Sequence, residues 1–210
     1  MAAARFSTGL AGLDAQLGGG VPAGSSHVVI GEPMNAQELL SYHFAAAGTA
    51  AGGTVFYTTD YTEEEVVAGL RRVGGKPERM AVVSLPKDDH WKIAAPGKGV
   101  RIVVDSYSDI VLEWGWDEAF QQLRKLKVQT RKAGGNLFIS CATGLHDEAQ
   151  RTRLRQWADG VLELGFDRQG FGLYPYLKVT KLRGVPESSR FLLFKETEQG
   201  LFMESTKRVF

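Results

Sequence analysis

Short apolar runs alternate with amphipathic segments up to Trp157. Apolar runs of about 4–8 residues are typical of buried strands, whereas apolar spacings of three and four are typical of helices. One helix has a capping box from Thr62 to Glu65 and stops at Gly74–Gly75. The predicted strands are His27–Ile30, Thr54–Thr58, Met80–Ser84, Val100–Asp105 and Asn136–Cys141, and the predicted helices are Asn35–Ala47, 62–73, Asp117–Lys132 and His146–Trp157, with a loop at Pro86–Gly99.

The pattern changes after Gly160, because no helical segment separates the remaining apolar runs. Strands joined by short turns pair antiparallel, whereas alternating strands and helices give a parallel sheet covered on both faces. The four predicted C-terminal strands are Val161–Leu164, Leu177–Leu182, Phe191–Phe194 and Leu201–Met203. We therefore expect one α/β domain over residues 1–210, with a parallel βα core at about 25–157 and antiparallel C-terminal strands at about 160–204.

Composition narrows the class of protein. The chain has 210 residues, 43% of them apolar and 23% charged, which suits a globular domain. It has no apolar run of the roughly 18 residues needed to cross a membrane and no secretory leader pattern, and its single cysteine, Cys141, excludes an internal disulfide. We expect a cytoplasmic protein without a membrane contact. The net charge of +1 and the pI near 7.8 do not favour DNA as a partner, since DNA-binding domains commonly have a pI above about 9.

Four motifs in one order resemble the KaiC and archaeal RadA branch of the RecA-like ATPases. The first, Phe6–Gly24, reads F-S-T-G-L-A-G-L-D-A-Q-L-G-G-G-V-P-A-G. Val100–Ser106 is similar to the Walker B strand of that family, and Ala158–Leu164 and Tyr176–Gly184 are similar to its C-terminal strands with a K-x-R-G motif. The resemblance covers nearly the whole chain and implies a RecA-like three-layer sandwich.

The phosphate-binding loop departs from the family pattern G-x-x-x-x-G-K-[S/T]. The segment from Gly31 reads G-E-P-M-N-A-Q-E-L, so Ala36 replaces the second glycine, Gln37 the lysine and Glu38 the hydroxyl residue. In a working loop the lysine reaches the β- and γ-phosphates and the hydroxyl holds Mg²⁺. The degenerate nucleotide site that we expect comprises Gly31, Met34, Ala36, Gln37, Glu38, Leu39 and Asp105.

These replacements argue against nucleotide binding. A hydrogen bond to a charged group contributes about 1.5–3 kcal/mol, so losing the lysine weakens binding by roughly ten- to over a hundredfold. Glu38 places an anion where the phosphates would bind. One hypothesis is that Glu38 itself occupies the anion position at the helix start. The simpler interpretation is that Gln37 and Glu38 are ordinary polar residues of a first helical turn.

Two further family positions bear on catalysis. The resemblance implies two glutamates after the second strand, one of which activates water, but Tyr61 and Thr62 stand there in the ungapped alignment. Asp60 would replace one of them if the register shifts by one residue. Asp105 matches the family residue that supports Mg²⁺ through water.

Lys181 and Arg183 match residues that in the family reach the nucleotide of the adjacent subunit. Their retention implies a homo-oligomer, or a hetero-oligomer with RecA/KaiC-like proteins, in which they act in trans. The alternative interpretation is that they are exposed charges on an edge hairpin.

We therefore expect a catalytically inactive, regulatory or structural KaiC/RadA-like subunit with no catalytic residue, no metal ligand and no cofactor. The alternative is an ATP-binding protein or slow ATPase with an altered loop, which would use ATP and Mg²⁺ in signalling or in DNA recombination and repair. A third class is a DNA-repair accessory protein that binds DNA without hydrolysis, and its DNA affinity would fall steeply with salt.

Overall fold

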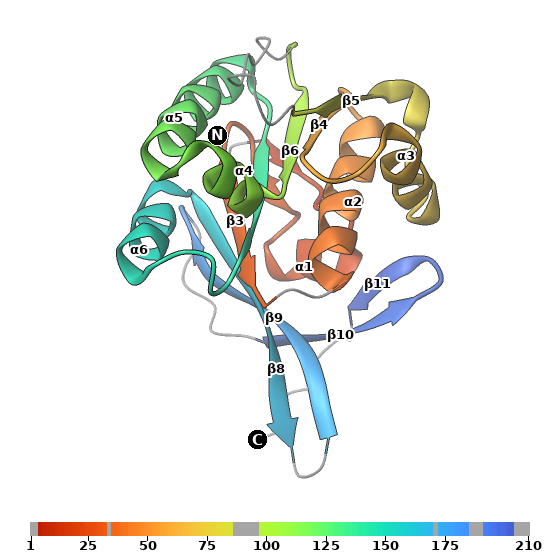
Figure 1. The fold of residues 1–210 in the computed structure, drawn as a ribbon. Helices are drawn as coiled ribbons and strands as arrows, with labels where there is room; N and C mark the ends of the chain where they lie inside the picture. The colour runs from red at the N-terminus through yellow and green to blue at the C-terminus, as the bar shows by residue number, and fades with distance from the viewer. Residues whose placement is uncertain (1–3, 33–34, 86–96, 170–171, 185–190, 204–210) are drawn as a thin grey trace.

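The computed structural model describes residues 4–32, 35–85, 97–169, 172–184 and 191–203. Their central feature is a nine-stranded sheet in the order β11-β10-β9-β8-β3-β7-β6-β4-β5, with helices on both sides (Figure 1). This arrangement confirms the α/β three-layer sandwich. The predicted loop at Pro86–Gly99 lies mostly outside the described residues.

The parallel part of the sheet follows the predicted apolar runs. It consists of β3 (Ser26–Gly31), β4 (Thr54–Thr58), β5 (Met80–Ser84), β6 (Arg101–Asp105) and β7 (Leu137–Ala142). Neighbouring pairs among them run parallel. Strands β3, β6 and β7 are buried almost throughout, as is usual for a parallel sheet with two covered faces.

The C-terminal strands extend this sheet at one edge. They are β8 (Gly160–Gln169), β9 (Gly172–Leu182), β10 (Phe191–Thr197) and β11 (Gly200–Met203). They pair antiparallel with one another, as predicted, while β8 joins β3 in parallel. The β8–β9 hairpin is longer than the predicted strands and projects from the body of the molecule (Figure 1).

Two groups of helices cover the two faces of the sheet (Figure 1). On one face, α1 (Ala11–Gln16), α2 (Asn35–Thr49) and α3 (Glu63–Arg72) bury one apolar cluster with β10 and β11. On the other, α4 (Tyr107–Trp114), α5 (Trp116–Ala133) and α6 (Glu148–Trp157) bury a second cluster. The capping box of Thr62 and Glu65 begins α3 as predicted, whereas the pattern did not predict α4, α1 or the one-turn helix η1 (Pro77–Arg79).

The glycine-rich N-terminal motif is held together by hydrogen bonds to one carboxylate. The carboxylate of Asp14 accepts hydrogen bonds from the backbone N–H and hydroxyl of Thr8, at 2.7 and 2.6 Å, and from the Ser7 hydroxyl. Strands β1 (Arg5–Phe6) and β2 (Val21–Pro22) pair beside it. Gly20 has φ +101° and lies against the backbone of Phe6, so a side chain would not fit there.

Candidate functional site

The described residues of the altered loop, Gly31 and Ala36 to Leu39, lie at the carboxyl end of β3, where β6, β7 and β4 also end along one edge of the sheet. Ligands of open parallel sheets bind at such an edge. Gly31 ends β3, and a Cβ atom added to it would stand 2.8 Å from Cβ of Leu164. The side chains at this edge differ from those of a phosphate cradle, and the nucleotide site stays a prediction.

Gln37, at the position of the family lysine, turns inward. Its side-chain Nε2–H donates to the Cys141 carbonyl oxygen at 2.8 Å, and the residue is only 8% exposed. Ala36 and Leu39 are buried beside it in the apolar cluster under α2. Met34 lies outside the described residues. The amide that replaces the lysine is thus used to bind the end of β7.

Glu38 is half-buried in the first turn of α2. Its carboxylate is hydrogen-bonded to the hydroxyl of Tyr42, one turn further along the helix, and burial followed by this carboxylate raises the pKa of Tyr42. The described contact of Glu38 is therefore with a side chain of its own helix. The hypothesis that Glu38 occupies an anion position at the helix start stays a prediction.

Asp105 ends β6 and is only 6% exposed. The Ser140 hydroxyl donates to its Oδ1 atom. Burial raises the pKa of Asp105 to about 6 despite this hydrogen bond, and the negative charges of Glu38 and Asp109 act in the same direction. An ionised carboxylate at such a buried position costs folding free energy. Groups of this kind gather at functional sites, so this edge of the sheet is a candidate functional site.

Asp60 follows β4 and faces Asp109 of α4. The two carboxyl groups share a hydrogen bond, and burial together with Asp60 raises the pKa of Asp109. Burial, Glu38 and Asp105 raise the pKa of Tyr61 to about 12. Within the described part of the chain, the charges that shift these pKa values are all carboxylates, and no group of three metal-ligating side chains is present.

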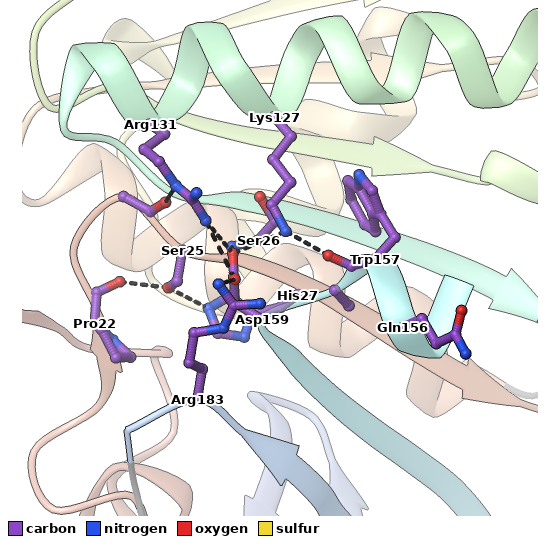
Figure 2. Close-up of polar contacts among 12 residues, drawn as sticks. Pro22, Ser25, Ser26, His27, Lys127, Arg131, Gln156, Trp157, Asp159 and Arg183 are labelled. Atoms are coloured by element: carbon purple, nitrogen blue, oxygen red, sulfur yellow. Dashed lines mark hydrogen bonds and ion pairs between the residues drawn. The ribbon is translucent and has the colours of Figure 1, made fainter. Parts of the chain in front are cut away.

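A second polar cluster occupies the opposite end of β3, around Asp159 (Figure 2). Asp159 precedes β8 and is 3% exposed. Its carboxylate accepts from the Ser26 N–H at 3.1 Å and pairs with three cations: Lys127 at 3.1 Å, Arg131 at 3.0 Å and Arg183 at 3.3 Å. Burial alone would raise the pKa of Asp159, but Lys127, the Ser26 N–H and Arg131 outweigh it and hold the pKa below its ordinary value.

Lys181 and Arg183, which the resemblance places in trans, have different surroundings. Lys181 Nζ donates to the carbonyl oxygens of Arg155, Gln156 and Ala158 at 2.8, 3.2 and 2.6 Å, so it caps the C-terminal end of α6. The Arg183 side chain is 65% exposed and contacts Asp159 with one nitrogen. Of the two, Arg183 has the side chain that a neighbouring molecule can reach.

Sequence reasoning did not identify the cluster around Asp159. Lys127 and Arg131 lie in a predicted helix, and both side chains point at the Asp159 carboxylate (Figure 2). Their spacing of four residues puts them on one helix face. That spacing, together with a lone aspartate just before a predicted strand, is the signal that could have indicated the cluster.

Comparison with known proteins places this geometry in a family context. The model of the family described as "Family of unknown function (DUF7125)" matches residues 5–198. UPF0273 protein MK0039 of Methanopyrus kandleri is 23% identical over 239 aligned residues, which cover 99% of this chain and 94% of that protein. The crystal structure of KaiC-like protein PH0186 from Pyrococcus horikoshii has a TM-score of 0.75 at 18% identity, covering 97% of this chain and 100% of the other. The KaiC-like, RecA-type fold is thus confirmed. The described residues also contain no helix long and apolar enough to span a membrane.

Proposed function

Because the chain belongs to the DUF7125 family and has a KaiC-like fold, we propose that it is a catalytically inactive RecA-fold subunit. It acts as a structural or regulatory component, assembling with copies of itself or with related RecA-fold chains, and needs neither ATP nor Mg²⁺.

The observation that carries this proposal is the hydrogen bond from Gln37 to the carbonyl of Cys141. A triphosphate needs a cation and free backbone N–H groups at this position. Here the side chain is neutral, buried and already satisfied by the protein. Binding a phosphate through Gln37 would break this buried hydrogen bond, which contributes about 0.5–1.5 kcal/mol.

Electrostatics supports the same conclusion. Glu38, Asp60, Asp105 and Asp109 act on one another or on the same tyrosines. A polyanion brought to this edge meets like charge in a partly desolvated place, where repulsion is stronger than in water. The residues described at this edge therefore do not fit Mg-ATP.

The surface next to Asp159 offers a group through which the chain could assemble. Arg183 presents an exposed guanidinium whose planar fork suits carboxylates and phosphates on a neighbour. Lys181 would contribute indirectly, by holding the end of α6 in place next to Arg183.

Titration calorimetry with Mg-ATP tests the inactive site. We expect no binding at millimolar ATP by the wild-type chain. The triple variant Ala36→Gly, Gln37→Lys, Glu38→Thr restores the loop motif, and we expect it to bind at least tenfold more tightly, since it regains one charge-assisted contact and loses one repulsive charge. Micromolar binding of Mg-ATP by the wild type would instead favour the ATP-binding alternative.

Light scattering tests the assembly. We expect a mass larger than that of one chain, alone or after mixing with a RecA-fold partner, and the same mass with and without ATP. A chain that stays monomeric both alone and after mixing, or that assembles only when ATP is added, would refute the proposal of a nucleotide-independent subunit.

A further inference from the structure

A pocket of about 290 Å³ opens in front of the Asp159 cluster. Its walls come from distant parts of the chain: the turn after β2, the end of α5 and the end of β9 (Figure 2). The lining includes Gly24, Ser25, Arg131, Asp159 and Arg183. Ser26 and Gly31 start and end β3, so this pocket and the altered loop are about 16 Å apart at 3.3 Å per residue.

The pocket has more positive than negative charge. Lys127, Arg131 and Arg183 pair with the single carboxylate of Asp159, which leaves two positive charges unbalanced (three minus one). Lys181 adds a third, against about half a negative charge at the C-terminal end of α6. The pKa of Lys127 is lowered by burial and then, despite Asp159, by Arg131 and Arg183, which is consistent with this surplus.

The two arginines present this surplus positive charge to a ligand. Arg131 uses Nη2 for both oxygens of Asp159 and Nε for the Gly24 carbonyl, and its side chain is 51% exposed. Arg183 uses Nη1 for Asp159. Among the described residues, the other N–H groups of both guanidinium groups have no partner. Asp159 thus holds two arginine forks side by side with donors to spare.

The other polar groups of the pocket wall are occupied. Ser25 Oγ lies 2.6 Å from His27 Nε2, donates to the Pro22 carbonyl and accepts from Asn136 at 3.0 Å. The Gly24 N–H donates to the Gly135 carbonyl at 2.8 Å. Recognition at this pocket therefore depends on the arginines.

We propose that this pocket binds a phosphate group, with Arg131 and Arg183 as its ligands and Asp159 as the residue that positions them. A phosphate monoester carries about two negative charges and three acceptor oxygens at pH 7, which matches two unbalanced charges and two free forks. A carboxylate offers one charge and two oxygens, so it matches only half of the site. The proposal does not depend on the inactive loop or on assembly.

A competing explanation is that the arginines only neutralise Asp159. One cation balances one carboxylate, and Lys127, whose side chain is 13% exposed, already supplies it. Two additional, half-exposed arginines exceed that requirement. Their exposure also means that each can be replaced without opening a cavity.

The test is calorimetric titration of the full chain at pH 7.5 and constant ionic strength with three probes: inorganic phosphate, glycerol phosphate and acetate. We expect one saturable site for phosphate and glycerol phosphate and at least tenfold weaker binding of acetate. Tighter binding of glycerol phosphate than of phosphate would identify a phosphorylated small molecule as the ligand, and equal binding would identify free phosphate.

Variants locate the site. Arg131→Ala and Arg183→Ala should each weaken phosphate binding at least tenfold, and Arg183→Lys should weaken it less, because it keeps the charge and loses the fork. Arg72→Ala is the control, because it removes the same charge from the exposed pair with Glu196 on the other face of the molecule. It should leave phosphate binding unchanged. Circular dichroism checks that each variant folds.

Three results would overturn the proposal: no saturation by either phosphate probe up to about 10 mM, equal binding of acetate and phosphate, or wild-type binding by Arg183→Ala. Glu38→Gln, at the altered loop, should leave phosphate binding unchanged. If it tightens that binding, because a repulsive charge is lost, the phosphate belongs to the loop, and the inactive-site proposal fails as well.

Discussion

Replacing Asp105 with asparagine should stabilise the protein at neutral pH. The substitution keeps the size and the Oδ1 acceptor that Ser140 contacts, and removes a charge that is 6% exposed. Buried carboxylates normally stabilise a protein only when a cation pairs with them. The charges described around Asp105 are carboxylates, so the ionised side chain costs stability.

The magnitude follows from the pKa. Burial raises the pKa of Asp105 from 3.8 to about 6, and two pKa units correspond to about 3 kcal/mol between the two protonation states. This shift already includes the hydrogen bonds from Ser140 and Ser41, which lower the pKa. We expect Asp105→Asn to be more stable than the wild type by about 3 kcal/mol at pH 7.

The dependence on pH has a definite sign. Because folding raises this pKa, the folded state binds the proton more tightly, and the contribution of Asp105 to stability falls as the pH rises from 3.8 through 6. The advantage of the variant should therefore grow by about 2 kcal/mol between about pH 4.5 and 7.5. An advantage that stays constant over this range, or a destabilised variant at pH 7, would refute the reasoning.

Urea unfolding followed by circular dichroism measures both free energies. Asp159→Asn is the matched control, because it removes the same charge from the other end of the sheet, where three cations surround it. Breaking a buried pair commonly costs about 3–5 kcal/mol, so the control should be destabilised. The same substitution is thus expected to have opposite signs at the two sites.

Three further predictions concern local structure. Thr62→Ala should cost about 1 kcal/mol in urea unfolding through loss of the capping box, with Thr62→Ser close to wild type. Gly20→Ala should cost at least about 2 kcal/mol, because φ is +101° and the new Cβ would meet the Phe6 carbonyl oxygen; a melting temperature equal to that of the wild type would contradict it. Burial lowers the pKa values of His27 and His43 to about 4, so the stability of the Asp105→Asn variant, which lacks the opposing titration of Asp105, should fall as the pH drops from 6.5 towards 4; unfolding curves of that variant that do not change over this range would argue against neutral, buried histidines.

Most of the fold could be predicted because its strands are buried on both faces. The centre of β6, Ile102–Val104, is apolar and buried throughout, which is typical of a strand covered on both faces. The helix α4 was not predicted, because Tyr107–Trp114 directly precedes α5 with only Gly115 between them. The two helices therefore follow each other without a polar loop. The outer half of β8 was not predicted, because it projects from the body of the molecule and its apolar residue Phe166 is exposed instead of buried in a core.

The sequence predicted where the residues of the candidate site lie, but not which groups they contact. Motif spacing located Gly31, Gln37, Glu38 and Asp105 at one edge of the sheet. It could not indicate that the Gln37 amide binds the Cys141 carbonyl, because that contact joins residues 104 apart in the sequence. The same limit applies to Asp159, whose partners come from α5 and the end of β9.

The separation of retained from altered family motifs has a physical explanation. Asp14 and Gly20 are used inside the fold, where they hold the N-terminal segment whether or not a ligand is present. A lysine in the phosphate loop instead serves the phosphates, and without a nucleotide a buried ammonium group costs more desolvation free energy than a neutral side chain. Gln37 is neutral and bonds the protein itself. A chain that no longer binds ATP would therefore be expected to keep the first group of residues and replace the second, which is the combination found here.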